Sequence, residues 1–255
     1  ALGGLPPIDM HAHVRPDIAA TELAALESLT FAATRTLDEA EQALARSDGW
    51  TVWGVGCHPG LVGAQKAFDA ARFAELIEQT SFVSEVGLDG SSRVPLKTQQ
   101  ETFSAILSVI QTTPRIVSVH SFSATEEVLE ALSAIPNRAV VLHWWLGNEE
   151  QTERALDLGC YFSVNASMVR RSEILAWLPA ERVLTETDHP FGDRFVRGVR
   201  RPGNVGIVED GLAATLGVPY DLRKLMWRNL KELVVSVGCG SMLPGPVRVT
   251  LATVV

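Results

Sequence analysis

Eight β-rich runs recur along the chain, and amphipathic stretches separate most of them. The runs read LPPIDMHAH, SLTFAAT, WTVWGVGCH, SFVSEVG, RIVSVHS, RAVVLHWW, CYFSVNAS and RVLTETDHP. The amphipathic stretches carry apolar residues at three- and four-residue spacing, which predicts helices over 70–79, 98–111, 124–134, 149–158 and 172–178, and a last helix over about 221–235. Strands that alternate with helices favour a parallel sheet.

Eight such units in 255 residues match a (β/α)8 TIM barrel of the α/β class, whose active site lies at the C-terminal ends of the strands. A doubly wound open sheet is the alternative, although no Gly-x-Gly-x-x-Gly turn follows the first run to support its dinucleotide-binding form. We expect one domain over residues 1–255, because no linker or repeat divides the chain. The tail from about 238 to 255 is interrupted by glycines and prolines. It could be an extra strand, a packed extension or sequence added by cloning.

The acidic balance of the chain limits its partners. A formal net charge of −8 argues against a broad basic surface that grips duplex DNA unaided, because Lys and Arg carry such binding. Handling of phosphates would therefore need metal cations or a local arginine cluster. The three cysteines include no close pair, which fits a reducing compartment. No signal peptide or membrane span is recognisable, so we expect a cytoplasmic protein without a membrane partner.

All six histidines fall at or just past the C-terminal ends of predicted strands. In the first run alternate side chains share a face, so Asp9, His11 and His13 are expected on one side. A barrel would gather the histidines at one mouth together with Glu85 and Asp188. Imidazoles and carboxylates are usual ligands of divalent ions, and a bridging carboxylate can hold two ions about 3.5–4 Å apart. We therefore predict a binuclear metal site.

An ordered series of motifs resembles a known enzyme family. The series is His-x-His, then Glu-x-Gly-Leu-Asp, then two strand-end histidines, then Glu-Thr-Asp-x-Pro. It is similar to that of the TatD-type metal-dependent deoxyribonucleases of the amidohydrolase superfamily. GCHP at 56–59, and Gln99 followed by Phe103, resemble further family positions. The resemblance covers the chain from Ile8 to about Leu230 and implies an amidohydrolase-like barrel that hydrolyses ester bonds.

The resemblance also implies a role for each ligand. His11, His13 and Asp188 would bind one divalent ion. Glu85 would bridge to a second ion, which His120 and His143 would also bind. The two ions would be Zn²⁺, Mg²⁺ or Mn²⁺. His58 resembles a position on the substrate side of the site, and a hydrogen-bonded loop histidine beside Pro59 is the alternative interpretation.

Three carboxylates are candidates for catalytic or supporting roles. Two divalent ions lower the pKa of water and neutralise phosphate oxygens. Asp188 is the candidate general base, since a carboxylate at the metal can accept the proton of the attacking water. Glu85 is the second catalytic candidate through its bridging position. Glu186 shares the inward face with Asp188 by alternation, and it either orients a histidine ligand or pairs with an arginine of the barrel.

Arginines and tryptophans supply candidate substrate contacts. Four arginines follow Asp188 within positions 194–201, and of these Arg200 and Arg201 are predicted to bind phosphate, with solvated surface charge as the alternative. Trp144 and Trp145 could stack on an unpaired base, although adjacent aromatics are as often core packing. By strand alternation, Trp145 is the one expected to point inward beside the ligands.

Three positions depart from the family pattern and bring the substrate into question. Phe122 stands where the family has the arginine of His-Ser-Arg, Trp-Trp-Leu follows His143 where Cys-Phe-Thr is usual, and His189 replaces a small side chain. More narrowly, SEVGLDGS, HWWLG, GCYFSVNASM and LTETDHPF are similar to the TatD-type nuclease component of Qat anti-phage defence systems. That similarity implies protein partners in a defence complex.

The leading hypothesis is a metal-dependent nuclease that acts on single-stranded DNA or strand ends, because a barrel mouth reaches a frayed end more readily than the middle of a duplex. One alternative is another hydrolase on the same site, such as a lactonase, an amidase or an aminoacyl-tRNA deacylase. The arginine cluster favours phosphate. A second alternative is a catalytically idle subunit that binds partners, although buried ionisable groups without a metal would be costly.

Overall fold

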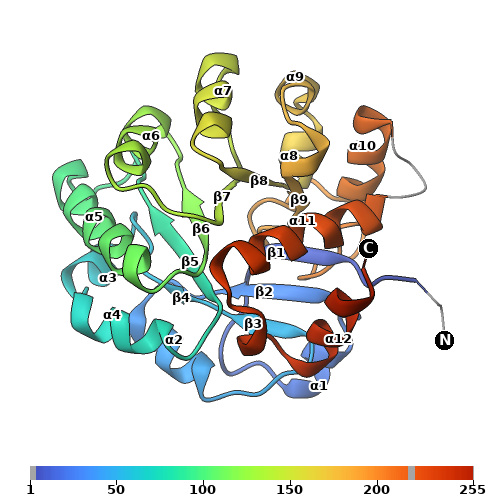
Figure 1. Ribbon diagram of the computed structural model, residues 1–255, viewed down its shortest axis with the longest axis horizontal. Helices are drawn as coiled ribbons and strands as arrows, with labels where there is room; N and C mark the ends of the chain where they lie inside the picture. Colours follow the sequence, from blue (N-terminus) through green and yellow to red (C-terminus); the bar gives the residue numbers. More distant parts are fainter. Residues whose placement is uncertain (1–3, 218–221, 255) are drawn as a thin grey trace.

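The computed structural model describes residues 4–217 and 222–254, and its strands run parallel around a barrel (Figure 1). One sheet contains β1 (Ile8–His13), β2 (Leu29–Ala33) and β3 (Thr51–Trp53). The other contains β4 (Val55–Gly56), β5 (Phe82–Gly87), β6 (Ile116–His120), β7 (Val140–His143), β8 (Tyr161–Val164) and β9 (Val183–Thr185). Each of the eight predicted runs contributes a strand, and only Gly54 separates β3 from β4.

The barrel closes between its first and last strands. The Asp188 amide donates to the His11 carbonyl at 2.8 Å, and the His13 amide donates to the His189 carbonyl at 2.9 Å. Each neighbouring pair within the two sheets is parallel and in sequential order. The expected (β/α)8 barrel is therefore confirmed, and the open sheet is excluded because it would leave the first and last strands apart.

Helices surround the barrel, and some of them begin with a side-chain N-cap, contributed by Thr36, Asp69, Asn148 and Asn165. They are α1 (Ala20–Ala24), α2 (Leu37–Leu44), α3 (Val62–Lys66), α4 (Ala70–Ile77), α5 (Leu96–Thr112), α6 (Thr125–Ala134), α7 (Glu149–Asp157), α8 (Ala166–Val169), α9 (Ser172–Ala176), α10 (Gly206–Leu216), α11 (Leu222–Val237) and α12 (Gly245–Thr253). Two short 3₁₀ turns, η1 (Ala180–Arg182) and η2 (Gly240–Met242), complete the described elements. Asn148 and Gln151 form a reciprocal capping box at α7, which satisfies amides that the first helical turn leaves unpaired.

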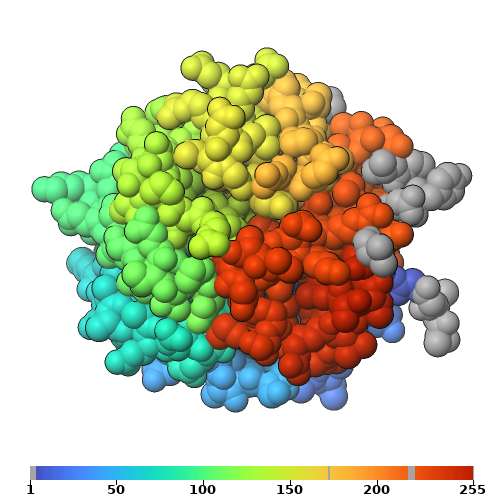
Figure 2. Space-filling model, in the orientation of Figure 1, coloured from blue at the N-terminus to red at the C-terminus, as the bar shows by residue number. Residues whose placement is uncertain are grey.

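The N-terminal ends of the strands are covered by α11. The Trp227 indole donates to the carbonyl of Pro6 at 2.8 Å, just before β1. The Asn229 amide donates to the carbonyl of Val183, the first residue of β9, at 2.7 Å. Figure 2 shows the C-terminal segment, orange to red, occupying a broad part of the face seen in this view. The opposite end of the barrel is left for the strand ends that carry the histidines.

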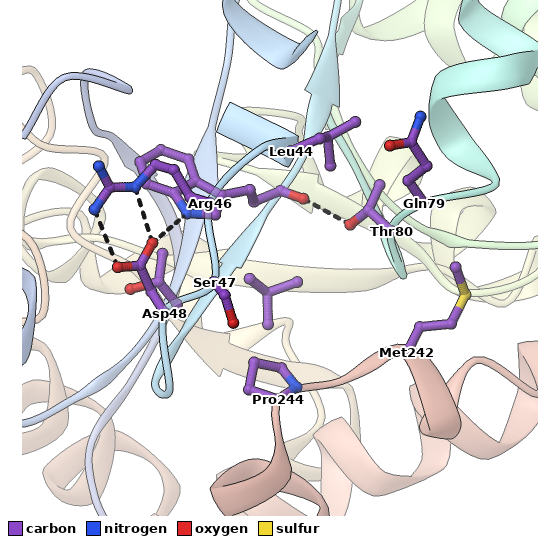
Figure 3. A pocket seen from close by; sticks show the side chains of 11 residues that line it. Leu44, Arg46, Ser47, Asp48, Gln79, Thr80, Met242 and Pro244 are labelled. Carbon is purple, nitrogen blue, oxygen red and sulfur yellow. Dashed lines mark hydrogen bonds and ion pairs between the residues drawn. The ribbon is translucent and has the colours of Figure 1, made fainter. Parts of the chain in front are cut away.

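The tail after residue 238 is a packed extension, and not a further strand. It forms η2 and α12, and Val247 and Leu251 of α12 are buried in the hydrophobic core. Between this tail and the start of β3 lies a cavity of about 180 Å³ (Figure 3). Its wall includes Asp48, whose carboxylate accepts hydrogen bonds from the Arg46 guanidinium and the Trp53 indole. No histidine lines this cavity, so the predicted metal site is elsewhere.

Candidate metal centre

The predicted ligands meet at the C-terminal ends of the strands. His11 and His13 end β1, Glu85 lies near the end of β5, His120 and His143 end β6 and β7, and Asp188 follows β9. Five of the six line one cleft of about 410 Å³, and His11 is fully buried beneath it. Residues separated by as many as 177 positions in the sequence are therefore neighbours in space.

Glu85 stands at the centre of this cluster. Its Oε2 atom is 2.7 Å from Nε2 of His11 and 3.1 Å from Nε2 of His13. Its Oε1 atom is 3.1 Å from Nδ1 of His120 and 3.5 Å from Nε2 of His143. Each carboxylate oxygen thus faces a different pair of imidazoles, which is the division that a bridging ligand requires.

Asp188 joins the side of the cluster that contains the β1 histidines. Its Oδ1 atom is 3.4 Å from Nε2 of His13 and 4.0 Å from Nε2 of His11. Three overlapping groups have ligand atoms within 4.8 Å of one another: His11 with His143 and Asp188, His11 with His13 and Glu85, and His58 with Glu85 and His120. Each group could hold a metal ion, and the number of ions and the division of ligands between them stay predictions.

Neighbouring side chains fix the orientation of two of the imidazoles. Ser118 Oγ lies 2.7 Å from Nδ1 of His11, so a proton on Nδ1 leaves the Nε2 lone pair directed into the cluster. Asp89 Oδ2 lies 3.5 Å from Nε2 of His120, an ion-pair contact and not a hydrogen bond, and its charge favours the proton there, which leaves Nδ1 for a metal. Sequence reasoning missed both residues. Ser118 is two positions before His120 on the same strand face, and Asp89 ends the Glu-x-Gly-Leu-Asp motif.

His58, unlike His11 and His120, directs a protonated nitrogen toward the cluster. The Gly60 amide donates to Nδ1 of His58 at 2.9 Å, so the proton of the neutral imidazole is on Nε2. That nitrogen faces the cleft and lies 3.5 Å from Glu85 Oε1. A metal ligand needs a free lone pair, whereas a protonated Nε2 can donate to a phosphate oxygen. The role at the substrate side that the resemblance implies therefore has a geometric basis and stays a prediction.

The site is built on strained backbone. Glu85, Asp188 and Trp144 have φ values of 44°, 43° and 43°, in the left-handed region that Gly adopts freely, Asn and Asp adopt occasionally, and most other residues adopt rarely. The pairing of β5 with β6 also shifts register between Val83 and Val86, which includes Glu85. Such positions cost about 1–3 kcal/mol each and persist where the surrounding structure holds them. Here the strain directs the two acidic ligands toward one point.

Asp9 does not join the ligand cluster, contrary to the expectation from alternation. The pairing of β1 with β2 shifts register between Asp9 and Ala12, so the regular alternation is broken. The Asp9 carboxylate instead accepts hydrogen bonds from the amide and hydroxyl of Thr187 and from the Gly203 amide, at 2.7–2.8 Å. These hydrogen bonds lower the pKa of Asp9, but burial outweighs them and raises it to about 6. Asp9 thus ties β1 to the segments that follow β9.

Glu186 fits neither of its two predicted roles. Its carboxyl contacts the Ser163 hydroxyl, the Asn165 amide at 3.0 Å and the Trp144 backbone amide at 3.1 Å, and no arginine is among these contacts within the described residues. Nδ1 of His143 lies 3.9 Å away, beyond hydrogen-bonding distance. Burial, and then the charge of Asp188, raise the pKa of Glu186 well above its usual value. Through its contact with the Trp144 amide, Glu186 therefore positions the backbone after β7.

The two tryptophans exchange their predicted places. Trp145 is fully buried, its indole donates to Thr152 Oγ1 at 2.9 Å, and its ring packs against Phe162. Trp144 lines the cleft instead. Alternation fails here because Trp144 adopts a left-handed conformation immediately after β7. The prediction that Trp145 contacts substrate is therefore wrong.

The predicted arginine pair also lies outside the cleft. The Arg201 guanidinium donates to the carbonyl of Ala25 at 3.3 Å, and neither Arg200 nor Arg201 is among the residues that line the metal cleft. Arg194 lines it, with its guanidinium 5.9 Å from the Trp144 ring centroid. Phe122 lines the cleft as well, at the position where the resembled family has an arginine. The predicted binding of phosphate by Arg200 and Arg201 therefore stays a prediction, and Arg194 is the arginine of this loop that lines the cleft.

The donors of the cluster fit divalent cations. Buried polar atoms of the ligands lack hydrogen-bond partners within the described residues, namely His13 Nδ1, His120 Nε2, both nitrogens of His143 and Asp188 Oδ1. Unpaired buried polar atoms are costly, and a cation would satisfy those that point to the cluster. Burial lowers the pKa of His13, but contacts with Asp188 and Glu85 outweigh burial and raise it to about 10. Burial raises the pKa of Glu85, but the imidazoles outweigh burial and hold it well below its usual value.

A parallel barrel with imidazoles and carboxylates gathered at its strand ends is the architecture of metal-dependent hydrolases. The family model described as "TatD related DNase" matches residues 8–234. The chain therefore belongs to the TatD-related DNase family, as its motifs suggested.

Relatives and solved structures agree with this assignment. The chain is 29% identical over 153 residues to the 3′-5′ ssDNA/RNA exonuclease TatD of Klebsiella pneumoniae, an alignment that covers 56% of this chain and 57% of that protein. It is 26% identical over 192 residues to the uncharacterized metal-dependent hydrolase YabD of Bacillus subtilis, covering 70% and 75%. The crystal structure of YjjV, a TatD homologue from Escherichia coli, matches with a TM-score of 0.79 at 21% identity and covers 89% and 97%. The last comparison supports the fold alone.

Proposed function

We propose that this protein hydrolyses phosphodiester bonds of DNA, at single strands or strand ends, with two divalent ions bound at the barrel mouth. The observation that carries the proposal is the central position of Glu85, whose two oxygens face different pairs of imidazoles. The chain supplies the donors that Zn²⁺, Mg²⁺ and Mn²⁺ use. When bound, such ions neutralise phosphate oxygens and acidify water.

The protein's own groups would carry the remaining steps. Asp188 Oδ1 faces the cluster without a hydrogen-bond donor within the described residues, so it is available to accept the proton of the attacking water. His58 would present its Nε2 proton to a phosphate oxygen, because Gly60 occupies Nδ1. Trp144 and Phe191 line the same cleft and would exclude water from one side of the scissile bond. Removal of Asp188 should therefore reduce the rate more than it changes the fold.

The biological setting is inferred from sequence resemblance. Similarity to the nuclease component of Qat systems leads us to infer a role in anti-phage defence, with protein partners and a cytoplasmic location. Within the described residues, no helix is both long and apolar enough to cross a bilayer. The exonuclease name of the Klebsiella relative supports a nucleic acid as substrate.

A metal count followed by a cleavage assay tests the proposal. The purified chain should contain two divalent ions and cleave end-labelled single-stranded DNA in a reaction that a chelator stops. Asp188→Asn should bind metal but cleave slowly, and His11→Ala should lose metal. Asp48→Asn, at the opposite end of the barrel, is the matched control and should retain both properties. Two bound ions without cleavage of any nucleic acid would contradict the proposal and favour a lactonase, amidase, deacylase or an idle subunit.

A further inference from the structure

A continuous surface of arginine and aromatic side chains leads away from the metal cleft. The cleft shares Phe122, Trp144 and Arg194 with an adjoining pocket, which adds Arg170 and Phe195. That pocket in turn shares Arg170 and Phe195 with a third pocket. The three hollows therefore form one path over the loop after β9 and the end of α8.

The side chains of this path are stacked on one another. The Arg194 guanidinium lies 5.9 Å from the centroid of Trp144 and 5.2 Å from that of Phe195. The Arg170 guanidinium lies 5.0 Å from the same Phe195 ring. Phe195 nevertheless exposes 56% of its surface. We call Trp144, Arg194, Phe195 and Arg170 the stacking track.

The track is attached to well-anchored segments. Asn165 caps α8 by accepting from the amides of Ser167 and Met168, and the Ser167 hydroxyl donates to the Gly192 carbonyl at 3.1 Å. In the loop after β9, Asp193 is buried and its carboxylate lies 2.7 Å from Nδ1 of His189. These contacts hold Arg170 and Arg194 in place relative to the metal cleft.

The charge of the path is opposite to that of the whole chain. Among the described residues, the two outer pockets are lined by four arginines, at positions 170, 171, 194 and 197, and by no acidic side chain. The chain as a whole has a formal net charge of −8. A positive path with exposed aromatic rings, continuous with a metal cleft, complements an unpaired strand, because phosphates meet guanidinium groups while bases stack on rings and guanidinium planes.

From this geometry, and resting on the function proposed above, we infer that the stacking track binds the unpaired nucleotides next to the scissile phosphate. Arg194 faces the cleft that Phe122 also lines, so it supplies a guanidinium where the family arginine is replaced by a phenyl group. The protein should therefore bind a longer single strand more tightly than a dinucleotide. A duplex should gain little from the track, because its paired bases cannot stack on Phe195.

Fluorescence anisotropy with a labelled 12-nucleotide single strand tests this inference. Binding is measured in the full-length chain carrying Asp188→Asn, with Mg²⁺ present, so that cleavage does not interfere. Phe195→Ala should weaken single-strand binding about fivefold or more, and should affect a 12-base-pair duplex less. Arg170→Ala should weaken binding and reduce the salt dependence, with the slope of log K against log[salt] falling by about 0.7.

Arg182→Ala is the matched control. The Arg182 guanidinium also lies over an aromatic ring, 4.8 Å from the centroid of Tyr161, but η1 places it at the N-terminal end of the barrel. It should leave the Kd and the salt slope unchanged. If the intact chain cleaves DNA but Phe195→Ala and Arg170→Ala bind the single strand as tightly as their parent, the inference is overturned. The stacking track would then be a candidate surface for a protein partner. Equal losses for single strand and duplex, or an equal loss in Arg182→Ala, would overturn it too. Failure of the intact chain to cleave any strand would instead count against the proposed function.

Discussion

The adjacent tryptophans after β7 permit a direct test of which of them belongs to the hydrophobic core, because only the core residue should contribute strongly to the free energy of unfolding. Trp145 is fully buried, packs against Phe162 and donates to Thr152, whereas Trp144 lines the cleft. Truncation of a buried Trp to Ala costs about 3–5 kcal/mol through lost transfer free energy and the remaining cavity. The lost hydrogen bond adds little, because the Thr152 hydroxyl still donates to the Asn148 carbonyl at 2.7 Å. We therefore expect Trp145→Ala to lower the free energy of unfolding by about 4 kcal/mol.

Thermal unfolding followed by circular dichroism measures this effect. For a protein of this size, 1 kcal/mol corresponds to about 2–4 °C, so Trp145→Ala should lower Tm by about 8–16 °C. Trp144→Ala should change the free energy of unfolding by less than about 1 kcal/mol, because its ring is partly exposed. Equal destabilisation by the two variants, or greater destabilisation by Trp144→Ala, would refute the assignment of Trp145 to the core.

A double-mutant cycle adds an internal check on the same packing. A Cβ atom on Gly147 would lie 2.1 Å from the Trp145 ring, closer than side chains can approach. Gly147→Ala should therefore destabilise the native chain, but should be tolerated better in the Trp145→Ala background, where the ring is absent. Additive effects of the two changes would show that Gly147 is constrained by something other than this ring.

Three further predictions concern backbone strain, pH and the metal. Because Asp188 has a φ of 43°, Asp188→Gly should be more stable than Asp188→Ala by about 1 kcal/mol in urea unfolding, and equal stability would argue against strain there. Burial tends to raise the pKa of Asp48, but the hydrogen bonds from Arg46 and Trp53 outweigh burial and lower this pKa. The stability that Asp48 contributes is therefore present above its pKa in the unfolded chain and is lost as the pH falls through its pKa in the folded chain. The native chain should be more stable than Asp48→Asn near neutral pH, and this difference in the free energy of unfolding should shrink between about pH 5 and pH 2. His13 has a pKa of about 10 without metal and must lose its proton to bind an ion, so the apparent metal affinity should rise from pH 6 to pH 8 in titrations with a competing chelator, and an affinity independent of pH would contradict this ligand assignment.

The barrel and the gathering of its candidate metal ligands could be predicted from sequence because both depend on local patterns. Each strand needs a short apolar run and each helix a three- and four-residue periodicity, and both signals are visible without tertiary information. The chain direction of a parallel barrel then brings all strand ends to one mouth. His11, His120 and Asp188 could therefore be grouped although they are far apart along the chain.

The supporting residues could not be predicted in this way, because they depend on departures from regular geometry. The register shift after Asp9 directs its carboxylate to Thr187, and the left-handed backbone of Trp144 reverses the alternation that assigned Trp145 to the cleft. Glu186 illustrates the same limit. Its inward face was predictable, but its contact with the Trp144 amide depends on the loop that follows β7.

The amino-acid sequence by itself thus determined the kind of barrel, the family and the set of side chains that can bind metal, because periodicity and motif order survive in one dimension. The tertiary structure decided which arginine and which tryptophan face the cleft, and where the tail packs. These features depend on bulges, loop conformations and the docking of segments distant in sequence, whose energies are set by contacts that no local pattern encodes.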